Sequence, residues 1–221
     1  MTFTIQPAQP ADVPTLTSIL FAAFAADALL LQKCYPDTQA NRDWWTATML
    51  DQIAHPTTQI MKVVDDENDT IVAFAKWSCH GSELEKESEG HGGGAVQPSN
   101  KPSPDMNLVA CERLAAAQFK MQKDMMGERG HYWLNALATH PSYQRNGAAT
   151  MLVQWGMQQA DREGLECFSA CTGTAKSKVG GILERCGWLL EGREVVIQDM
   201  GLSTGDEELG CVFGGRRAGQ V

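Results

Sequence analysis

One β-α-β unit near the middle of this 221-residue sequence constrains its fold more than any other feature. Residues 131–139 are mostly aliphatic and aromatic and predict a strand, and Pro141 then forces an irregular connection. Residues 148–163 carry apolar residues at helical spacing and end at Gly164, a typical residue at a helix C-terminus. A second strand is predicted over 165–170. This order of strand, helix and strand indicates the mixed α/β class.

The rest of the sequence supplies further helices and strands around this unit. Helical spacing of apolar residues predicts helices over about 12–26, 39–52, 108–126 and 176–186. Alternation predicts strands over about 3–5, 58–64, 71–79, 188–190 and 194–200, and residues 211–213 could add an edge strand. Hydrophobic residues make up 43% of the chain, which is enough for a packed core.

Residues 81–105 differ in composition from their surroundings. They are rich in Gly, Ser, Glu, Pro and Lys, and Leu84 and Val96 are their only large aliphatic residues. Such a segment buries too little apolar surface to offset its chain entropy, so we expect a flexible insertion, with a substrate lid as the alternative. The expected organisation is a single domain over 1–201 that contains this insertion, followed by a Gly-rich C-terminal tail over 202–221.

Composition argues against several classes of function. The formal net charge is −9 and no basic cluster occurs, so we expect no nucleic-acid partner. Seven cysteines without a CxxC pair argue against a disulfide framework and a structural zinc site, and we expect no metal. We find no secretory signal and no apolar stretch long enough for a bilayer. These features favour a cytoplasmic protein without a membrane partner.

The predicted helix start at Gln144-Arg145-Asn146-Gly147-Ala148-Ala149 is the main candidate for a binding site. The first amides of a helix lack intrahelical partners, and together with the helix dipole they attract anions. Gly147 permits backbone conformations that a Cβ hinders, and the two alanines let a ligand approach closely. We therefore predict a phosphate or pyrophosphate site at about 144–150. The segment has neither the Lys-Ser/Thr of a P-loop nor the GxGxxG of a dinucleotide fingerprint.

This segment resembles the pyrophosphate loop of the GNAT acetyltransferase superfamily, Gln/Arg-x-x-Gly-x-Gly/Ala, at all three defined positions. Residues 137–144 and 160–164, on either side, look especially like fungal-type members, and Leu183-Glu184-Arg185-Cys186-Gly187-Trp188 resembles the family's Leu-Tyr-Glu-Lys-x-Gly-Phe signature. The resemblance implies a mixed, mostly antiparallel, twisted sheet of about six to seven strands flanked by helices. That sheet would be splayed between the strands at 131–139 and 165–170.

The resemblance further implies acetyl-CoA as cosubstrate. Main-chain groups of Leu137, Ala138 and Thr139 would pair with the pantetheine arm. The pyrophosphate would be held by the amides of Gln144, Arg145, Asn146, Gly147, Ala148, Ala149 and Thr150. The side chain of Arg145 would add positive charge.

The catalytic groups are less evident from the sequence. We expect a backbone N–H at Leu137 to stabilise the oxyanion of the thioester. Many family members carry a tyrosine as general acid where this chain has Leu183, so Cys171 is a candidate substitute, while Asn135 lies in the strand but cannot take a proton. Candidates for the general base are His80, His131, Tyr132, His140, Asp27 and Tyr35, and Trp44, Trp45 and Trp77 are candidates to line an acceptor pocket.

The leading hypothesis is an acetyl-CoA-dependent N-acetyltransferase that acts on the primary amine of a small molecule by direct attack in a ternary complex. One alternative is an acyl-CoA-binding or regulatory protein with weak or no catalysis, because the usual tyrosine is absent. Another is a peptide or protein N-acetyltransferase. We expect a monomer or a homodimer.

Overall fold

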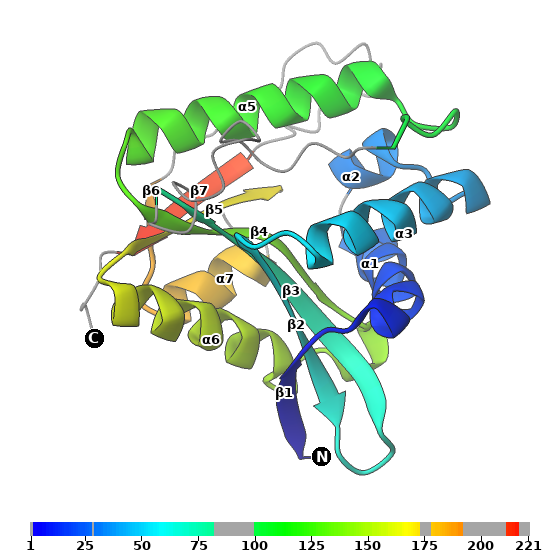
Figure 1. Ribbon diagram of the computed structural model, residues 1–221, viewed down its shortest axis with the longest axis horizontal. Helices are drawn as coiled ribbons and strands as arrows, with labels where there is room; N and C mark the ends of the chain where they lie inside the picture. The colour runs from blue at the N-terminus through cyan, green and yellow to red at the C-terminus, as the bar shows by residue number, and fades with distance from the viewer. Residues whose placement is uncertain (1, 28, 82–99, 173–177, 192–210, 217–221) are drawn as a thin grey trace.

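The computed structural model of the protein describes residues 2–27, 29–81, 100–172, 178–191 and 211–216 (Figure 1). The helices are α1 (Val13–Asp27), α2 (Leu29–Cys34), α3 (Gln39–Ile53), α5 (Leu108–Met126), α6 (Ala148–Glu163) and α7 (Lys178–Arg185), with 3-10 turns η1 (Pro10–Asp12) and η2 (Pro141–Tyr143). The strands are β1 (Phe3–Pro7), β2 (Thr58–Asp65), β3 (Thr70–His80), β4 (His131–Thr139), β5 (Glu166–Thr172), β6 (Leu189–Glu191) and β7 (Cys211–Arg216).

These strands form one sheet in the order β1-β2-β3-β4-β5-β7-β6. Neighbouring strands are antiparallel except β4 and β5, which are parallel and joined through α6. Strands β1 to β5 make up the body of the sheet, and β7 and β6 continue it beyond β5. The predicted mixed α/β class, with flanking helices around an open sheet, is confirmed.

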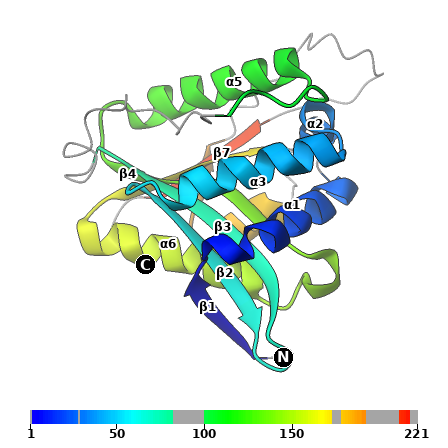
Figure 2. The same ribbon diagram turned by 45° about the vertical axis from the view of Figure 1, so that its right-hand side comes forward.

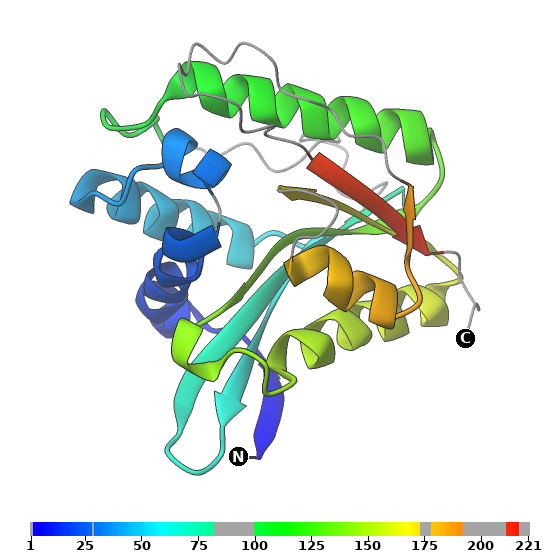
Figure 3. The same cartoon turned by 180° about the vertical axis from the view of Figure 1, so that it is seen from behind.

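The helices cover the two faces of the sheet unequally. Helices α6 and α7 lie on one face, while α1, α3 and α5 lie on the other (Figures 1, 2 and 3). Strand β3 shows the division, because Ala75, Trp77 and Cys79 belong to the hydrophobic cluster under α6, whereas Phe74 packs with α1. A third cluster, between α5 and the sheet, contains Trp133 and Phe168.

Helix α6 approaches the sheet very closely through a glycine. A Cβ added to Gly156 would lie 2.2 Å from two ring carbons of Trp77, a distance that no real Cβ contact shows. The indole of Trp77 is fully buried beneath the helix. This contact fixes the distance between α6 and β3, and so the position of the helix N-terminus relative to the sheet.

One expectation about the C-terminal region differs from the structure, and others fall outside the described residues. The predicted strand at 211–213 exists as β7, but β7 pairs with both β5 and β6, so among the described strands β6 and not β7 lies at this edge. The predicted strand at 194–200 and most of the predicted insertion at 81–105 lie outside the described residues. None of the described helices is long and apolar enough to cross a membrane.

Candidate functional site

The connection from β4 to α6 is shaped by left-handed backbone at two residues. Arg145 has φ 66° and Gly147, the N-cap of α6, has φ 93°. A Cβ on Gly147 would meet no atom within 4 Å, so glycine is required there for its backbone conformation and the space before the helix is open. Two side-chain amides brace the loop: Gln144 donates to the carbonyl of Thr139 at 3.4 Å and Asn146 to that of Tyr143 at 3.4 Å.

The amides at the start of α6 are available to a ligand. The first backbone hydrogen bond of the helix runs from the N–H of Met151 to the carbonyl of Gly147 at 3.1 Å. Within the part of the chain that the structure describes, the amides of residues 145–150 have no acceptor. Unpaired amides at the positive end of a helix dipole, in front of open space, fit an anionic group such as a diphosphate. The prediction included the amide of Gln144, but that N–H donates to the carbonyl of Pro141 at 3.3 Å, so the unpaired amides begin at Arg145.

Beside this loop, the sheet opens between β4 and β5. The two strands pair only from His131 with Glu166 to Leu134 with Ser169. The Ser169 hydroxyl donates to the carbonyl of Leu134 at 3.1 Å, at the last pair before the strands part. From there β4 continues to Thr139 paired with β3 alone among the described strands. The opening therefore falls between the two strands where the sequence predicts it.

A bulge in β4 lies at the start of this opening. Trp77 pairs with Leu134 and Lys76 with Ala136, so Asn135 is an extra residue in β4. The side chain of Asn135 lies on the face of α1, α3 and α5, where the Ser78 hydroxyl donates to its Oδ1 at 2.8 Å. Ser78 Oγ is also 3.0 Å from Nε2 of His80. Asn135 and His80 were predicted separately from the sequence, whereas Ser78, which joins them, was not.

The other predicted cosubstrate residues of β4 follow this bulge. Leu137 is half-buried and packs toward the α6 cluster, whereas Ala138 is buried on the opposite face. The hydroxyl of Thr139 is buried without a hydrogen-bond partner among the described residues. These residues form the edge of β4 that borders the opening.

A polar row runs along β3 on the same face as Asn135. It consists of Lys76, Ser78 and His80, at alternate positions of the strand. Lys76 donates to the buried side chain of Gln52 on α3 at 3.1 Å, and burial lowers the pKa of its ammonium from 10.5 to about 8. Lys76 was not predicted from the sequence, although a lysine inside an otherwise apolar strand pattern was a signal for it.

The position of the family tyrosine is apolar in this protein. Leu183 is fully buried between α6 and α7, and its carbonyl accepts from the N–H of Trp188 at 3.0 Å. The candidate substitute Cys171 lies in β5 opposite Val212, but its side chain is outside the described part. Within the described ranges, no group of three or more metal-binding side chains could hold a metal ion.

Several candidate bases have structural partners. His140 accepts from the N–H of Ser142 at 3.3 Å, which makes it part of the loop. The hydroxyl of Tyr132 donates to Glu163 at 2.7 Å, and burial, together with that hydrogen bond, raises its pKa. His131 is buried, with Nδ1 2.8 Å from the carbonyl of Arg129. The side chain of Asp27 lies outside the described part.

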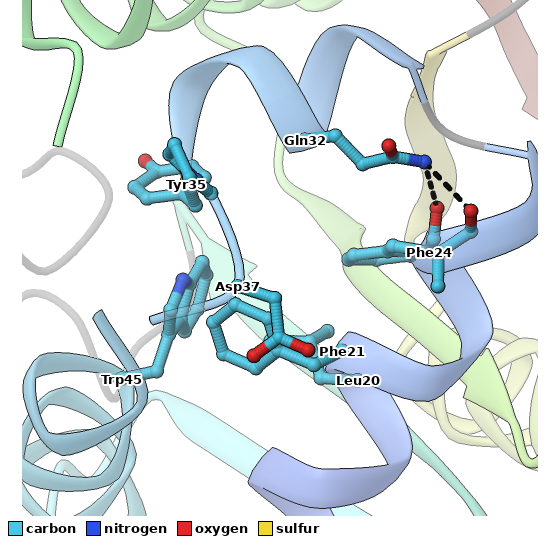
Figure 4. A pocket seen from close by; sticks show the side chains of 9 residues that line it. Leu20, Phe21, Phe24, Gln32, Tyr35, Asp37 and Trp45 are labelled. Carbon is cyan, nitrogen blue, oxygen red and sulfur yellow. Dashed lines mark hydrogen bonds between the residues drawn. The ribbon is translucent and has the colours of Figure 1, made fainter. Parts of the chain in front are cut away.

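An apolar pocket of about 290 Å³ lies among α1, α2 and α3 (Figure 4). Its lining comprises Leu20, Phe21, Phe24, Ala25, Gln32, Tyr35, Pro36, Asp37 and Trp45. Leu20 also belongs to the hydrophobic cluster that contains Ala138 of β4, so the α1 wall of the pocket is part of the core that packs on the sheet. Of the three candidate tryptophans, Trp45 lines this pocket, Trp44 stacks on Tyr35, and Trp77 lies on the other face of the sheet.

Charge inside this pocket is largely compensated. Asp37 supplies a carboxylate, and the guanidinium of Arg42 donates two hydrogen bonds to it, of 2.6 and 2.8 Å. The amide of Gln32 donates to the carbonyls of Phe24 and Ala25 at 2.8 and 3.0 Å. The pocket therefore presents mainly aromatic and aliphatic surface to a ligand.

The sheet thus opens between β4 and β5 beside the unpaired amides at the start of α6, and an apolar pocket lies among the helices of the other face. The chain belongs to the GNAT acetyltransferase family, since the model of the "Acetyltransferase (GNAT) family" matches residues 28–188. The matched residues include both strands of the opening and the start of α6. The expectation of an acyltransferase enzyme is thereby confirmed. No curated protein matches the sequence.

Solved structures of similar fold cover almost the whole chain. The C-terminal condensation domain of Ebony, in complex with β-alanyl-dopamine, has a TM-score of 0.69 at 10% identity, over 99% of this chain and 100% of that chain. A Drosophila melanogaster polyamine N-acetyltransferase has a TM-score of 0.64 at 12% identity, over 98% and 100%. A mosquito arylalkylamine N-acetyltransferase-like 5b has a TM-score of 0.61 at 12% identity, over 98% and 100%. At these identities the likeness establishes the fold alone.

Proposed function

We propose that this protein is an acetyl-CoA-dependent N-acetyltransferase that acetylates the primary amine of a small molecule by direct attack in a ternary complex. The observation that carries the proposal is the row of unpaired amides at residues 145–150, beside the opening between β4 and β5. These amides would hold the diphosphate of CoA. The edge of β4 at Leu137, Ala138 and Thr139 would guide the thioester into the opening.

The chain's own groups would then act on the thioester and the amine. A backbone N–H at Leu137 would stabilise the oxyanion that forms on the carbonyl oxygen. An ordinary alkylammonium has a pKa near 10.4, so only about one molecule in 2,500 is neutral at pH 7. An apolar pocket favours this neutral form, because burial disfavours the charged one. Direct attack needs no covalent intermediate on Cys171 or any other side chain.

We infer that the acceptor is an amine with an apolar or aromatic body. The pocket among α1, α2 and α3 supports this, since Phe21, Phe24, Tyr35 and Trp45 contribute to its lining and Arg42 already compensates Asp37. Proteins of similar fold include an arylalkylamine N-acetyltransferase-like protein and a domain that binds β-alanyl-dopamine. A long polycation would find little compensating charge in this pocket.

Purified protein incubated with acetyl-CoA and a panel of amines tests the proposal through the release of free thiol. The panel contains arylalkylamines, linear polyamines and amino acid amides. We expect acceptor-dependent thiol release, fastest with an arylalkylamine. No acceptor-dependent release with any member would contradict N-acetyltransferase activity, and equal rates for all members would contradict the apolar acceptor.

The second candidate is an acyl-CoA-binding protein with weak or no catalysis. The observation that favours it is the burial of Leu183 at the position of the family tyrosine, because no phenol is available there as proton donor. Calorimetric binding of CoA without turnover of any amine would support this candidate.

The remaining expectations stay predictions of this proposal. They are a cytoplasmic location, a monomer or homodimer, the absence of a nucleic-acid partner and of a metal, the fungal-type membership, and the domain organisation with a Gly-rich tail over 202–221.

A further inference from the structure

The side-chain amide of Asn135 is held from one side only. Ser78 has a single O–H, and it donates to Oδ1 of Asn135 at 2.8 Å. Nε2 of His80, 3.0 Å from Ser78 Oγ, must then be the donor in its contact with that oxygen. The three side chains therefore form a directed chain of hydrogen bonds that runs from His80 through Ser78 and ends on Asn135.

The nitrogen of the same amide is unpaired. Within the described residues, Nδ2 of Asn135 has no hydrogen-bond acceptor. This nitrogen is not fully enclosed by protein. The fully enclosed polar side-chain atoms without a partner, in the described part of the chain, are Asn41 Oδ1, Trp44 Nε1, Trp77 Nε1 and Thr139 Oγ1. Asn135 thus presents two N–H donors to accessible space, with its orientation set by Ser78.

That space lies at the opening of the sheet. Asn135 is the first residue of β4 beyond the last pair with β5, Leu134 with Ser169, and it is the extra residue of the bulge. Leu137, whose backbone N–H is the expected oxyanion donor, follows two residues later. A side-chain donor and a backbone donor thus lie on the same short stretch of strand.

We propose that Nδ2 of Asn135 donates a hydrogen bond to the thioester carbonyl oxygen as it becomes an oxyanion, and that Ser78 and His80 are positioning residues for this amide. The inference rests on the proposed function. The amine nitrogen forms the new bond to the carbonyl carbon, the electron pair of the C=O bond moves to oxygen and returns, and the C–S bond breaks with its pair on sulfur. Asn135 transfers no proton, and the proton of the amine passes to solvent.

Two substitutions of Asn135 separate donation from mere packing. Asn135→Asp keeps the shape and can still accept from Ser78, but it has no N–H, and Asn135→Ala removes the whole amide. Loss of one oxyanion donor lowers kcat by about 100- to 1,000-fold, and we expect this loss in both variants. Free CoA has no carbonyl at sulfur, so its Kd, measured by calorimetry, should stay unchanged. Asn68→Asp, an exposed amide in the β2–β3 turn, is the matched control and should keep wild-type kcat.

The positioning residues are tested by rescue. Ser78→Ala and His80→Ala each remove one hydrogen bond from the chain and should lower kcat by about 3- to 10-fold. His80→Gln restores an N–H donor and should recover most of the loss, which a purely structural histidine would not predict. KM for the amine should change little in all three, because the amide acts on the acetyl donor.

Failure of this inference differs from failure of the proposed function. An active wild-type enzyme with near wild-type kcat in Asn135→Asp would overturn the donor role, as would a loss of CoA affinity that matches the loss of kcat. His80→Gln as slow as His80→Ala would overturn the positioning role. A wild-type protein that neither binds CoA nor releases thiol would overturn both proposals. Circular dichroism melts identify any variant that has lost its fold, and Asn135→Asp, which differs least in shape, then decides.

Discussion

Gly147→Glu is the sharpest test of the anion site at the start of α6. Gly147 has φ 93°, and a side chain there would enter open space in front of residues 145–150. A glutamate at this position carries its negative charge toward the amides that would hold the diphosphate. It therefore repels the ligand and also competes with it for the same donors.

The size of the effect follows from charge and distance. Two unit charges about 5 Å apart, at an effective dielectric constant of about 20, interact by about 3 kcal/mol. At about 1.4 kcal/mol per tenfold change, a single repulsive pair weakens CoA binding by roughly 150-fold. The left-handed backbone adds about 1–2 kcal/mol of strain to the folded state, which lowers Tm by about 2–8 °C.

Gly164→Glu supplies the control on the same helix. Gly164 caps the C-terminus of α6 with φ 68°, and a Cβ there also meets no atom within 4 Å. This variant shares the backbone strain but places its charge at the opposite end of the helix. Calorimetry with CoA should show a loss of roughly 100-fold or more for Gly147→Glu only. Binding by Gly147→Glu within about threefold of wild type would refute the assignment of the anion site.

Three other predictions concern packing, charge and the pocket. Gly156→Ala places a Cβ 2.2 Å from the Trp77 ring and should lower Tm by about 4–8 °C in circular dichroism, whereas Gly181→Ala in α7, 3.5 Å from its nearest neighbour, should not lower it. Because burial lowers the pKa of Lys76 from 10.5 to about 8, its buried charge penalises the folded state below pH 8, and the penalty disappears as the pH rises toward 10.5. The unfolding free energy of wild type, measured with urea, should therefore rise relative to Lys76→Met between those pH values, and an unchanged difference would contradict the burial argument. Trp45→Ala should raise KM for an arylalkylamine by about tenfold through lost apolar contact, and a KM equal to that of wild type would place the acceptor elsewhere.

The fold elements near the site were predictable because their signals are local. Alternation and helical spacing gave β4 as 131–139 and α6 as 148–163, the same bounds that the structure has. The glycine that needs a left-handed backbone, Gly147, was also identified from the sequence. Such features depend on residues within a few positions of one another, so they can be predicted from the local sequence.

Trp45 was named from the sequence as a candidate for an acceptor pocket, but the pocket as a whole was not predictable, because it is assembled from separate segments. The pocket combines α1, the short helix α2 and α3, and α2 was absent from the predicted elements. Asn135 and Ser78 are 57 positions apart and meet only through the bulge that shifts β4 against β3. Pairing register is a tertiary property, so neither the contact nor the direction of the Asn135 amide can be derived from local pattern.

The polar row of β3 is better explained by chemistry than by folding. On its other face the same strand presents Ala75, Trp77 and Cys79, a packing surface that fits α6 closely. A strand covered by helices on both faces gains most from apolar residues on both, yet here one face carries a half-buried lysine, a buried serine and a half-buried histidine. The row lies between the hydrophobic clusters of α1 and α5, where β4 bulges and leaves β5. These polar side chains lower the stability of the fold at the point where the sheet opens. We expect such a penalty where side chains are retained for substrate binding and acetyl transfer.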